Sequence, residues 1–120
     1  MSQAYELGLK TATLIASVEL EDEQYYGVKM NTSEKVLLAS DGDKIIAVLQ
    51  DTPDAADRSC LVAYGGISKA MGGDAISAGV DVQCNAAGKF ITRVAGTVVG
   101  VAMTACGGDG QHFSLKIAQN

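Results

Sequence analysis

The side chains in this chain most suited to covalent chemistry are three cysteines and a single histidine. Cys106 precedes His112 by six residues, and a thiol activated by an imidazole is a known catalytic nucleophile. Residues 107–110 predict a four-residue hairpin loop, which places Cys106 opposite Gln111. His112 then lies opposite Ala105, on the other face of the sheet, because successive side chains of a strand alternate. The spacing therefore predicts a buried structural thiol and an ordinary edge histidine.

The same side chains are the candidate ligands of a metal ion. A zinc site would need the cysteines to converge with the histidine, yet the closely spaced ligand pairs typical of structural zinc sites are missing. The cysteines are Cys60, Cys84 and Cys106. Carboxylates concentrate in residues 19–23, and we predict a solvated turn there, because a metal site would need further ligands from elsewhere. We expect neither a metal nor a cofactor.

Three further patterns could carry chemistry, and each has a simpler structural explanation. The glycine patterns of residues 65–69 and 96–100 lack the full spacing of a phosphate loop and open no predicted helix. Lys89 follows a turn, as a carrier lysine would, but lacks the flanking methionines of biotin carriers. Asp41 and Asp43 sit at a turn, where aspartate is expected for backbone reasons. We therefore predict that the chain is not an enzyme.

Strands must position all of these side chains, because apolar and polar residues alternate along most of the chain. The predicted strands cover residues 11–20, 25–30, 36–40, 44–50, 60–64, 67–71, 80–84, 89–94, 97–106 and 111–118. We expect Asp41-Gly42-Asp43 and residues 85–88 to form hairpin turns, and residues 97–106, apolar at almost every position, to be covered on both faces. The prediction is all-β: a single small β-barrel or sandwich-like domain of about nine or ten short strands.

Composition and charge narrow the class of protein. The chain has 120 residues, enough for one domain, with 14 glycines and only six aromatic residues, which predicts a thin core and favours oligomerisation. The net charge of -5, without any cluster of basic residues, argues against a nucleic-acid partner. No apolar stretch approaches the length of a membrane span, and residues 1–10 lack the features of a secretion signal. The lack of a predicted secretion signal, together with the odd number of cysteines, predicts that the protein resides in a reducing cytosol.

The first ten residues have no clean periodicity, apart from an alternation of Tyr5, Leu7 and Leu9 with Glu6, Gly8 and Lys10. We predict an extended N-terminal arm over residues 1–10 and an all-β domain over residues 11–120. The alternation makes Tyr5, Leu7 and Leu9 the candidate apolar anchors of the arm.

An ordered set of short motifs runs through most of the chain. These are residues 11–18, Tyr25-Tyr26-Gly27-Val28-Lys29, residues 46–53, residues 62–69, residues 76–80, Asn85-Ala86-Ala87-Gly88, residues 99–102 and residues 113–117. In this order they resemble the small capsid decoration, or cement, proteins of tailed bacteriophages. The three cysteines and the acidic residues 19–23 depart from the pattern.

This resemblance implies a structural virion protein. It implies an all-β, barrel-like domain, often a homotrimer, which is assembled in the cytoplasm of the host bacterium and binds the outer surface of the phage head. There it would clamp neighbouring subunits of the major capsid protein and stabilise the head. The arm would pair with capsid elements by strand addition, with Tyr5, Leu7 and Leu9 as its anchors.

Two alternatives of other classes stay open. A small ligand-binding β-barrel would need a pocket, and a cysteine-dependent enzyme would need a thiol of low pKa near His112.

Overall fold

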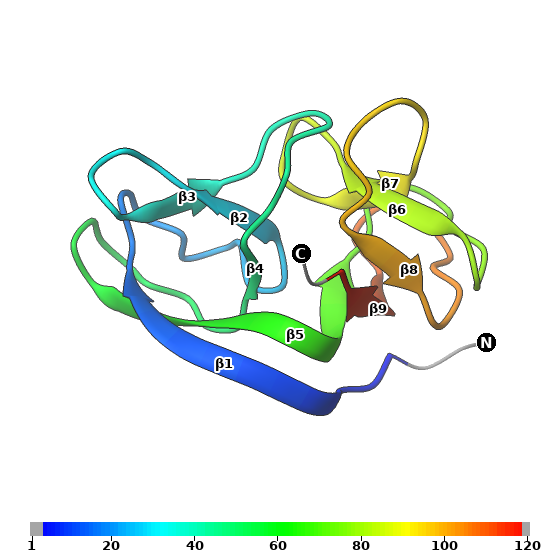
Figure 1. Ribbon diagram of the computed structural model, residues 1–120, viewed down its shortest axis with the longest axis horizontal. Helices are drawn as coiled ribbons and strands as arrows, with labels where there is room; N and C mark the ends of the chain where they lie inside the picture. Colours follow the sequence, from blue (N-terminus) through cyan, green and yellow to red (C-terminus); the bar gives the residue numbers. More distant parts are fainter. Residues whose placement is uncertain (1–3, 119–120) are drawn as a thin grey trace.

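The computed structural model describes residues 4–118 and shows an all-β protein, as predicted (Figure 1). Nine strands form one curled antiparallel sheet in the order β3-β2-β4-β5-β9-β8-β6-β7, with β1 also paired to β5. The strands are β1 (Leu7–Ile15), β2 (Gly27–Met30), β3 (Val36–Leu38), β4 (Ala47–Leu49), β5 (Ser59–Met71), β6 (Asp81–Cys84), β7 (Phe90–Thr92), β8 (Gly100–Ala102) and β9 (His112–Ile117).

Strand β5 is the long central strand that joins the two halves of the sheet. One of its edges pairs with β1 from Ser59 to Ile67, and the other pairs first with β4 and then, from Ile67 on, with β9. We predicted two strands separated by Gly65-Gly66, which is wrong, because β5 continues through both glycines. Gly66 adopts a φ of +88°, which an L-residue rarely tolerates. The glycine pair therefore lies where one edge of β5 passes from β4 to β9.

Each half of the sheet covers its own hydrophobic core, so the thin core predicted from composition is divided in two. The first cluster lies mainly among β6 to β9, with Val48 of β4 and Ala63 and Ala70 of β5 at its border. It contains Phe90 and Phe113, whose rings meet edge to face with centroids 6.1 Å apart. The second lies among β1 to β5 and contains aliphatic side chains such as Val28, Leu49 and Val62. The two phenylalanines are the aromatic residues among the buried members of the first core, and Tyr25 packs against it from outside.

The turn Asp41-Gly42-Asp43 does not form the predicted hairpin. Strand β2 lies between β3 and β4 and pairs with both, so this turn connects strands that are not neighbours. The Asp43 carboxylate accepts hydrogen bonds from the Ser40 amide and, at 2.7 Å, from Lys29 Nζ on β2. The turn chemistry was therefore correct, but the pairing depends on contacts with β2. The turn at residues 85–88 does join β6 and β7 as a hairpin.

The apolar run of residues 97–106 forms a much shorter strand than predicted, because β8 spans only Gly100–Ala102. At Gly100 the backbone approaches so closely that an added Cβ would lie 2.2 Å from the Lys116 carbonyl oxygen. After β8 the chain stays beside β9 as far as Met103 and Thr104, which both hydrogen-bond to Ser114. Cys106 then forms an isolated bridge with Ile76 instead of pairing with Gln111. Within this run Val99, Gly100, Ala102 and Cys106 are buried, whereas Met103 and Ala105 are exposed. The prediction that both faces of the run are covered is therefore wrong.

Candidate docking surface

Strand β1 runs beside β5 along one side of the molecule (Figure 1). Its register is regular from Thr11, opposite Ala63, to Ile15, opposite Ser59. Within the described part of the chain, β5 is the strand to which β1 pairs, so the other edge of β1 carries no partner strand. Residues 7–10 belong to β1 as well, and the predicted boundary after residue 10 therefore does not coincide with the end of an element. Residues 1–3 of the predicted arm lie outside the described residues.

Two irregularities interrupt the pairing at the N-terminal half of β1. Leu7 lies opposite Ile67 and Lys10 opposite Gly65, so β1 contains one extra residue there, and Gly8 adopts a φ of +63°. The next pair joins Thr11 to Ala63, so that β5 in turn carries an extra residue, Tyr64. Such bulges change the face to which a side chain points.

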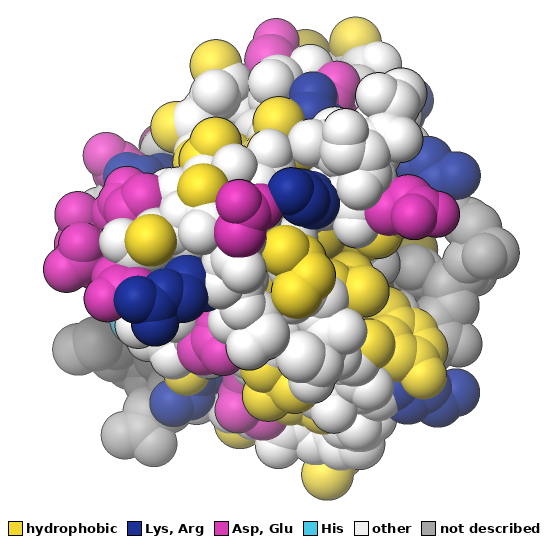
Figure 2. All heavy atoms as spheres, turned by 90° about the vertical axis from the view of Figure 1, so that its left-hand side faces the viewer, with side chains coloured by type: hydrophobic (Ala, Val, Ile, Leu, Met, Phe, Trp, Pro, Cys, Tyr) yellow, Lys and Arg dark blue, Asp and Glu magenta, His cyan; other side chains and the backbone are white. Residues whose placement is uncertain are grey.

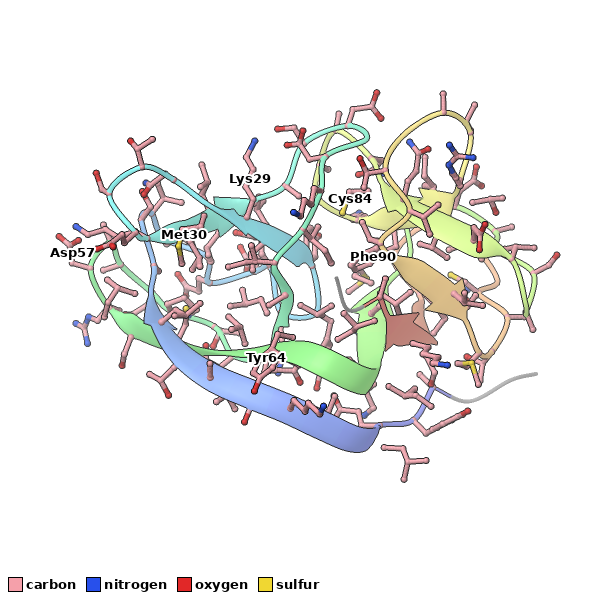
Figure 3. The ribbon with its side chains drawn as sticks, in the orientation of Figure 1. Lys29, Met30, Asp57, Tyr64, Cys84 and Phe90 are labelled. Carbon is pink, nitrogen blue, oxygen red and sulfur yellow. The ribbon has the colours of Figure 1, made fainter. Side chains whose placement is uncertain are left out.

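The bulge separates the three candidate anchor residues. Leu7 is 65% exposed and Tyr5 is 40% exposed, whereas Leu9 is partly buried and packs against the first core. Tyr64, which is 47% exposed, lies on β5 beside β1 (Figure 3). Cys84 and Phe90, also labelled there, lie in the half of the sheet formed by β6 to β9. Alternation alone would place Tyr5, Leu7 and Leu9 on one face, and Gly8 was the signal in the sequence that the alternation breaks.

The main chain at Tyr5 is fastened to β9 by a buried serine. The Ser114 hydroxyl accepts a hydrogen bond from the Tyr5 amide at 2.5 Å and donates one to the Tyr5 carbonyl oxygen at 2.8 Å. The Ser114 amide in turn donates to Thr104 Oγ1 at 2.9 Å. The N-terminal segment is therefore held at its backbone while the side chains of Tyr5 and Leu7 remain exposed. The alternation in β9 gave no sign of this role for Ser114.

A groove of about 480 Å³ lies next to this segment, between the N-terminal half of β1 and the edges of β5, β8 and β9. Its lining is aliphatic or glycine at most positions, with two lysines, Lys10 and Lys116. It was not predicted from the sequence, because its residues come from four strands that are distant along the chain.

The cysteines are buried in the two cores, and the sheet does not assemble them with His112. The Cys106 thiol donates hydrogen bonds to the carbonyl oxygens of Gly108 and Gln111, and the described residues show no hydrogen bond between a cysteine and His112. The exposed His112 ring instead packs edge to face against Tyr25, at 5.3 Å between centroids. Burial raises the pKa of the Cys84 thiol to about 12, which disfavours the thiolate needed for catalysis.

The remaining candidates are surface features. In residues 4–118 no group of three or more His, Cys, Asp or Glu side chains is placed to hold a metal ion. Residues 19–23 form a polar turn, in which burial and then the nearby charges of Glu19 and Asp22 raise the pKa of Glu23. Acidic side chains gather on one side of the face seen in Figure 2, and apolar side chains on another. Over the same described residues, no helix is long and apolar enough to traverse a lipid bilayer.

Comparison with known proteins finds a likeness in fold. No family model matches the chain, and no curated protein matches its sequence. A solved structure of the head fiber gp8.5 N base of bacteriophage phi29 superimposes with a TM-score of 0.70. The match covers 92% of this chain and 95% of that chain, at 16% sequence identity. The whole described domain, and not a fragment of it, therefore shares its fold with that phage protein.

Proposed function

We propose that this chain is a structural protein of a phage virion that decorates the outside of the head and stabilises contacts between major capsid protein subunits. The observation that carries the proposal is the match in fold, over nearly the full length of both chains, to a part of a phage head fibre. The ordered motifs of the sequence favour the same class of protein independently.

The surface chemistry supports a role in binding rather than in catalysis. The described thiols are buried, and desolvation raises the pKa of both Cys60 and Cys84. A negative net charge suits a protein that faces solvent and stays away from packaged DNA. The large apolar side chains that remain exposed are therefore the better candidates for function.

The N-terminal segment is the part of the chain that we propose to contact the capsid. Tyr5 and Leu7 present apolar surface, while the free edge of β1 offers unpaired backbone groups to a strand of the capsid protein. Leu9 would contribute indirectly, because it packs against the first core and holds the bulge in place.

Many copies on a lattice would turn modest contacts into strong collective binding. Each copy that bridges several capsid subunits binds the second subunit at a high effective concentration. We further propose that the copies associate as homotrimers on the head, which would bury part of the surface that the thin cores leave exposed.

The test is co-sedimentation of the purified protein with expanded phage heads that lack it. We expect saturable binding at a lattice-like copy number and a raised disruption temperature of the heads. Leu7→Glu should weaken binding at least tenfold, because it places a charge in an apolar contact. Val94→Glu is the matched control, since Val94 is an apolar side chain with 80% exposure in the connection between β7 and β8, and this variant should bind as the wild type does.

Two results would count against the proposal. Absence of wild-type binding would contradict the decoration role itself. Equal binding of the two variants would leave the decoration role in place but would contradict docking through the N-terminal segment.

A further inference from the structure

We propose that the groove between β1, β5, β8 and β9 receives an extended segment of the major capsid protein that combines apolar and acidic side chains. This inference rests on the proposed function and names the chemistry of the partner at that surface.

A row of cross-strand partners forms one wall of this groove and continues into the N-terminal segment. Leu7 of β1 lies opposite Ile67 of β5, which lies opposite Lys116 of β9. Lys116 in turn lies opposite Val101 of β8, and Val101 lies opposite Asp81 of β6 at the far end. Directly opposed residues point to the same face of a sheet, so these five side chains form a continuous outward row.

Glycines give the groove its depth. At Gly66 an added Cβ would lie 2.3 Å from the Gly8 carbonyl oxygen, and at Gly100 it would lie 2.2 Å from that of Lys116. Neighbouring strands therefore touch through their backbones, without side chains between them. Gly8 itself faces open space, because no heavy atom lies within 4 Å of its added Cβ. A partner chain can approach the main chain closely at this position.

The size of the groove suits a short extended segment. Adjacent strands lie about 4.8 Å apart, so the row from Leu7 to Val101 spans roughly 14 Å, the length of about four residues of extended chain. The volume of about 480 Å³ leaves room for apolar side chains of that segment against Ile67, Val98 and Val101, which are each only partly buried.

The charge of the groove is opposite to that of the protein as a whole. Lys10 and Lys116 are the charged side chains that line it, both exposed, and among the described residues neither forms an ion pair. Three other lysines are neutralised, in the pairs of Lys29 with Asp43, Lys35 with Asp57 and Lys89 with Asp109. Lys44 and Lys69 also form no ion pair among the described residues, but neither lines the groove. In a chain of net charge -5, this arrangement favours a partner with carboxylates, and such complementarity determines register and association rate.

Charge reversal at the two groove lysines tests the inference. Lys10→Glu/Lys116→Glu should bind expanded heads at least tenfold more weakly than the wild type, with a weaker dependence on salt. The matched control is Lys44→Glu/Arg93→Glu, which makes the same change in net charge at exposed positions outside the groove and should bind as the wild type does. Equal binding of the two double variants would overturn the inference and leave the decoration role intact, whereas only a failure of the wild type to bind would contradict that role.

A zero-length carbodiimide, which joins a lysine amine to a carboxylate as an amide with loss of water, identifies the occupant. On decorated heads we expect cross-links from Lys10 or Lys116 to Asp or Glu residues of the major capsid protein. Cross-links confined to another copy of this chain, or to its own C-terminal carboxylate, would overturn the inference. So would a small molecule that the native protein retains and releases only on denaturation, since it would occupy the same groove.

Discussion

Ser114 joins the N-terminal segment to the sheet through two hydrogen bonds of its hydroxyl group with Tyr5. Both groups of the Tyr5 backbone are satisfied by this one side chain, which is itself fully buried. The exposed side chain of Tyr5 is therefore presented from a fixed backbone rather than from a loose arm. In the contact with the capsid that we propose, the entropy of ordering this backbone would already be lost in the free protein.

Ser114→Ala should release this segment without unfolding the domain. The loss of two hydrogen bonds predicts a destabilisation of about 1 to 3 kcal/mol and faster hydrogen exchange at the Tyr5 amide. Ser68→Ala is the matched control, because Ser68 is another fully buried serine, with hydrogen bonds to Gln50 and to the Lys69 carbonyl oxygen. An equal increase in exchange at Tyr5 in both variants would show that the anchor is not specific to Ser114.

The buried thiols should resist modification in the native protein. With a pKa of about 12, Cys84 is ionised in about one molecule in ten thousand near pH 8, whereas a free thiol is substantially ionised there. We expect thiol reagents to label Cys84 only after denaturation, as mass spectrometry of the labelled peptides would report. Rapid labelling of Cys106 in the native protein would instead support the alternative of a cysteine-dependent enzyme.

The raised pKa of Cys84 also predicts how the stability of the fold changes with pH. The fold favours the neutral thiol of Cys84, so this contribution is complete below the pKa of the unfolded thiol and is lost as pH rises toward about 12. Urea unfolding of Cys84→Ala should therefore depend less steeply on pH in the alkaline range than unfolding of the wild type. Parallel curves for the two proteins would contradict burial of the thiol as the cause.

At the scale of elements, the bulged junction of β1 and β5 shapes the surface that we propose for docking. Gly8 and Gly66 both adopt positive φ there, and the two bulges turn Leu9 toward the core while Leu7 stays exposed. The edge of β1 and the groove meet at this junction, so a change in its backbone should affect both.

Gly66→Ala should be markedly more destabilising than Gly79→Ala. The two glycines have nearly the same φ, +88° and +87°, but an added Cβ meets the Gly8 carbonyl oxygen only at Gly66 and meets nothing within 4 Å at Gly79. Gly79→Ala should therefore cost about 1 to 2 kcal/mol from backbone strain alone. Gly66→Ala should cost at least about 1 kcal/mol more, because the clash must be relieved. Urea unfolding measures both, and equal losses would contradict the close approach of β1 and β5.

Alternation predicted where strands occur but not how they pair. The strand β9 and the hairpin of β6 and β7 were predicted because their signals are local. The turn at Gly42 was predicted, but its hairpin was not formed, because β2 comes from earlier in the chain and separates β3 from β4. The groove was beyond prediction for the same reason, since strand pairing over long sequence separations decides which residues line it.

At the scale of the whole molecule, two small cores share one long central strand and leave considerable apolar surface exposed. Exposed apolar surface of this kind suits the binding role that we propose, and the groove beside β1 lies on the outside of the sheet. The head fiber gp8.5 N base of bacteriophage phi29 has the same fold.

The most direct test of the proposed function is a cryo-electron microscopy reconstruction of phage heads assembled with this chain, compared with heads assembled without it. We predict extra density on the outer surface of the head, into which the nine-stranded domain fits with β1 toward the capsid and with a copy number related to the lattice. Identical heads in the two reconstructions, or density for this chain elsewhere in the virion, would contradict the account.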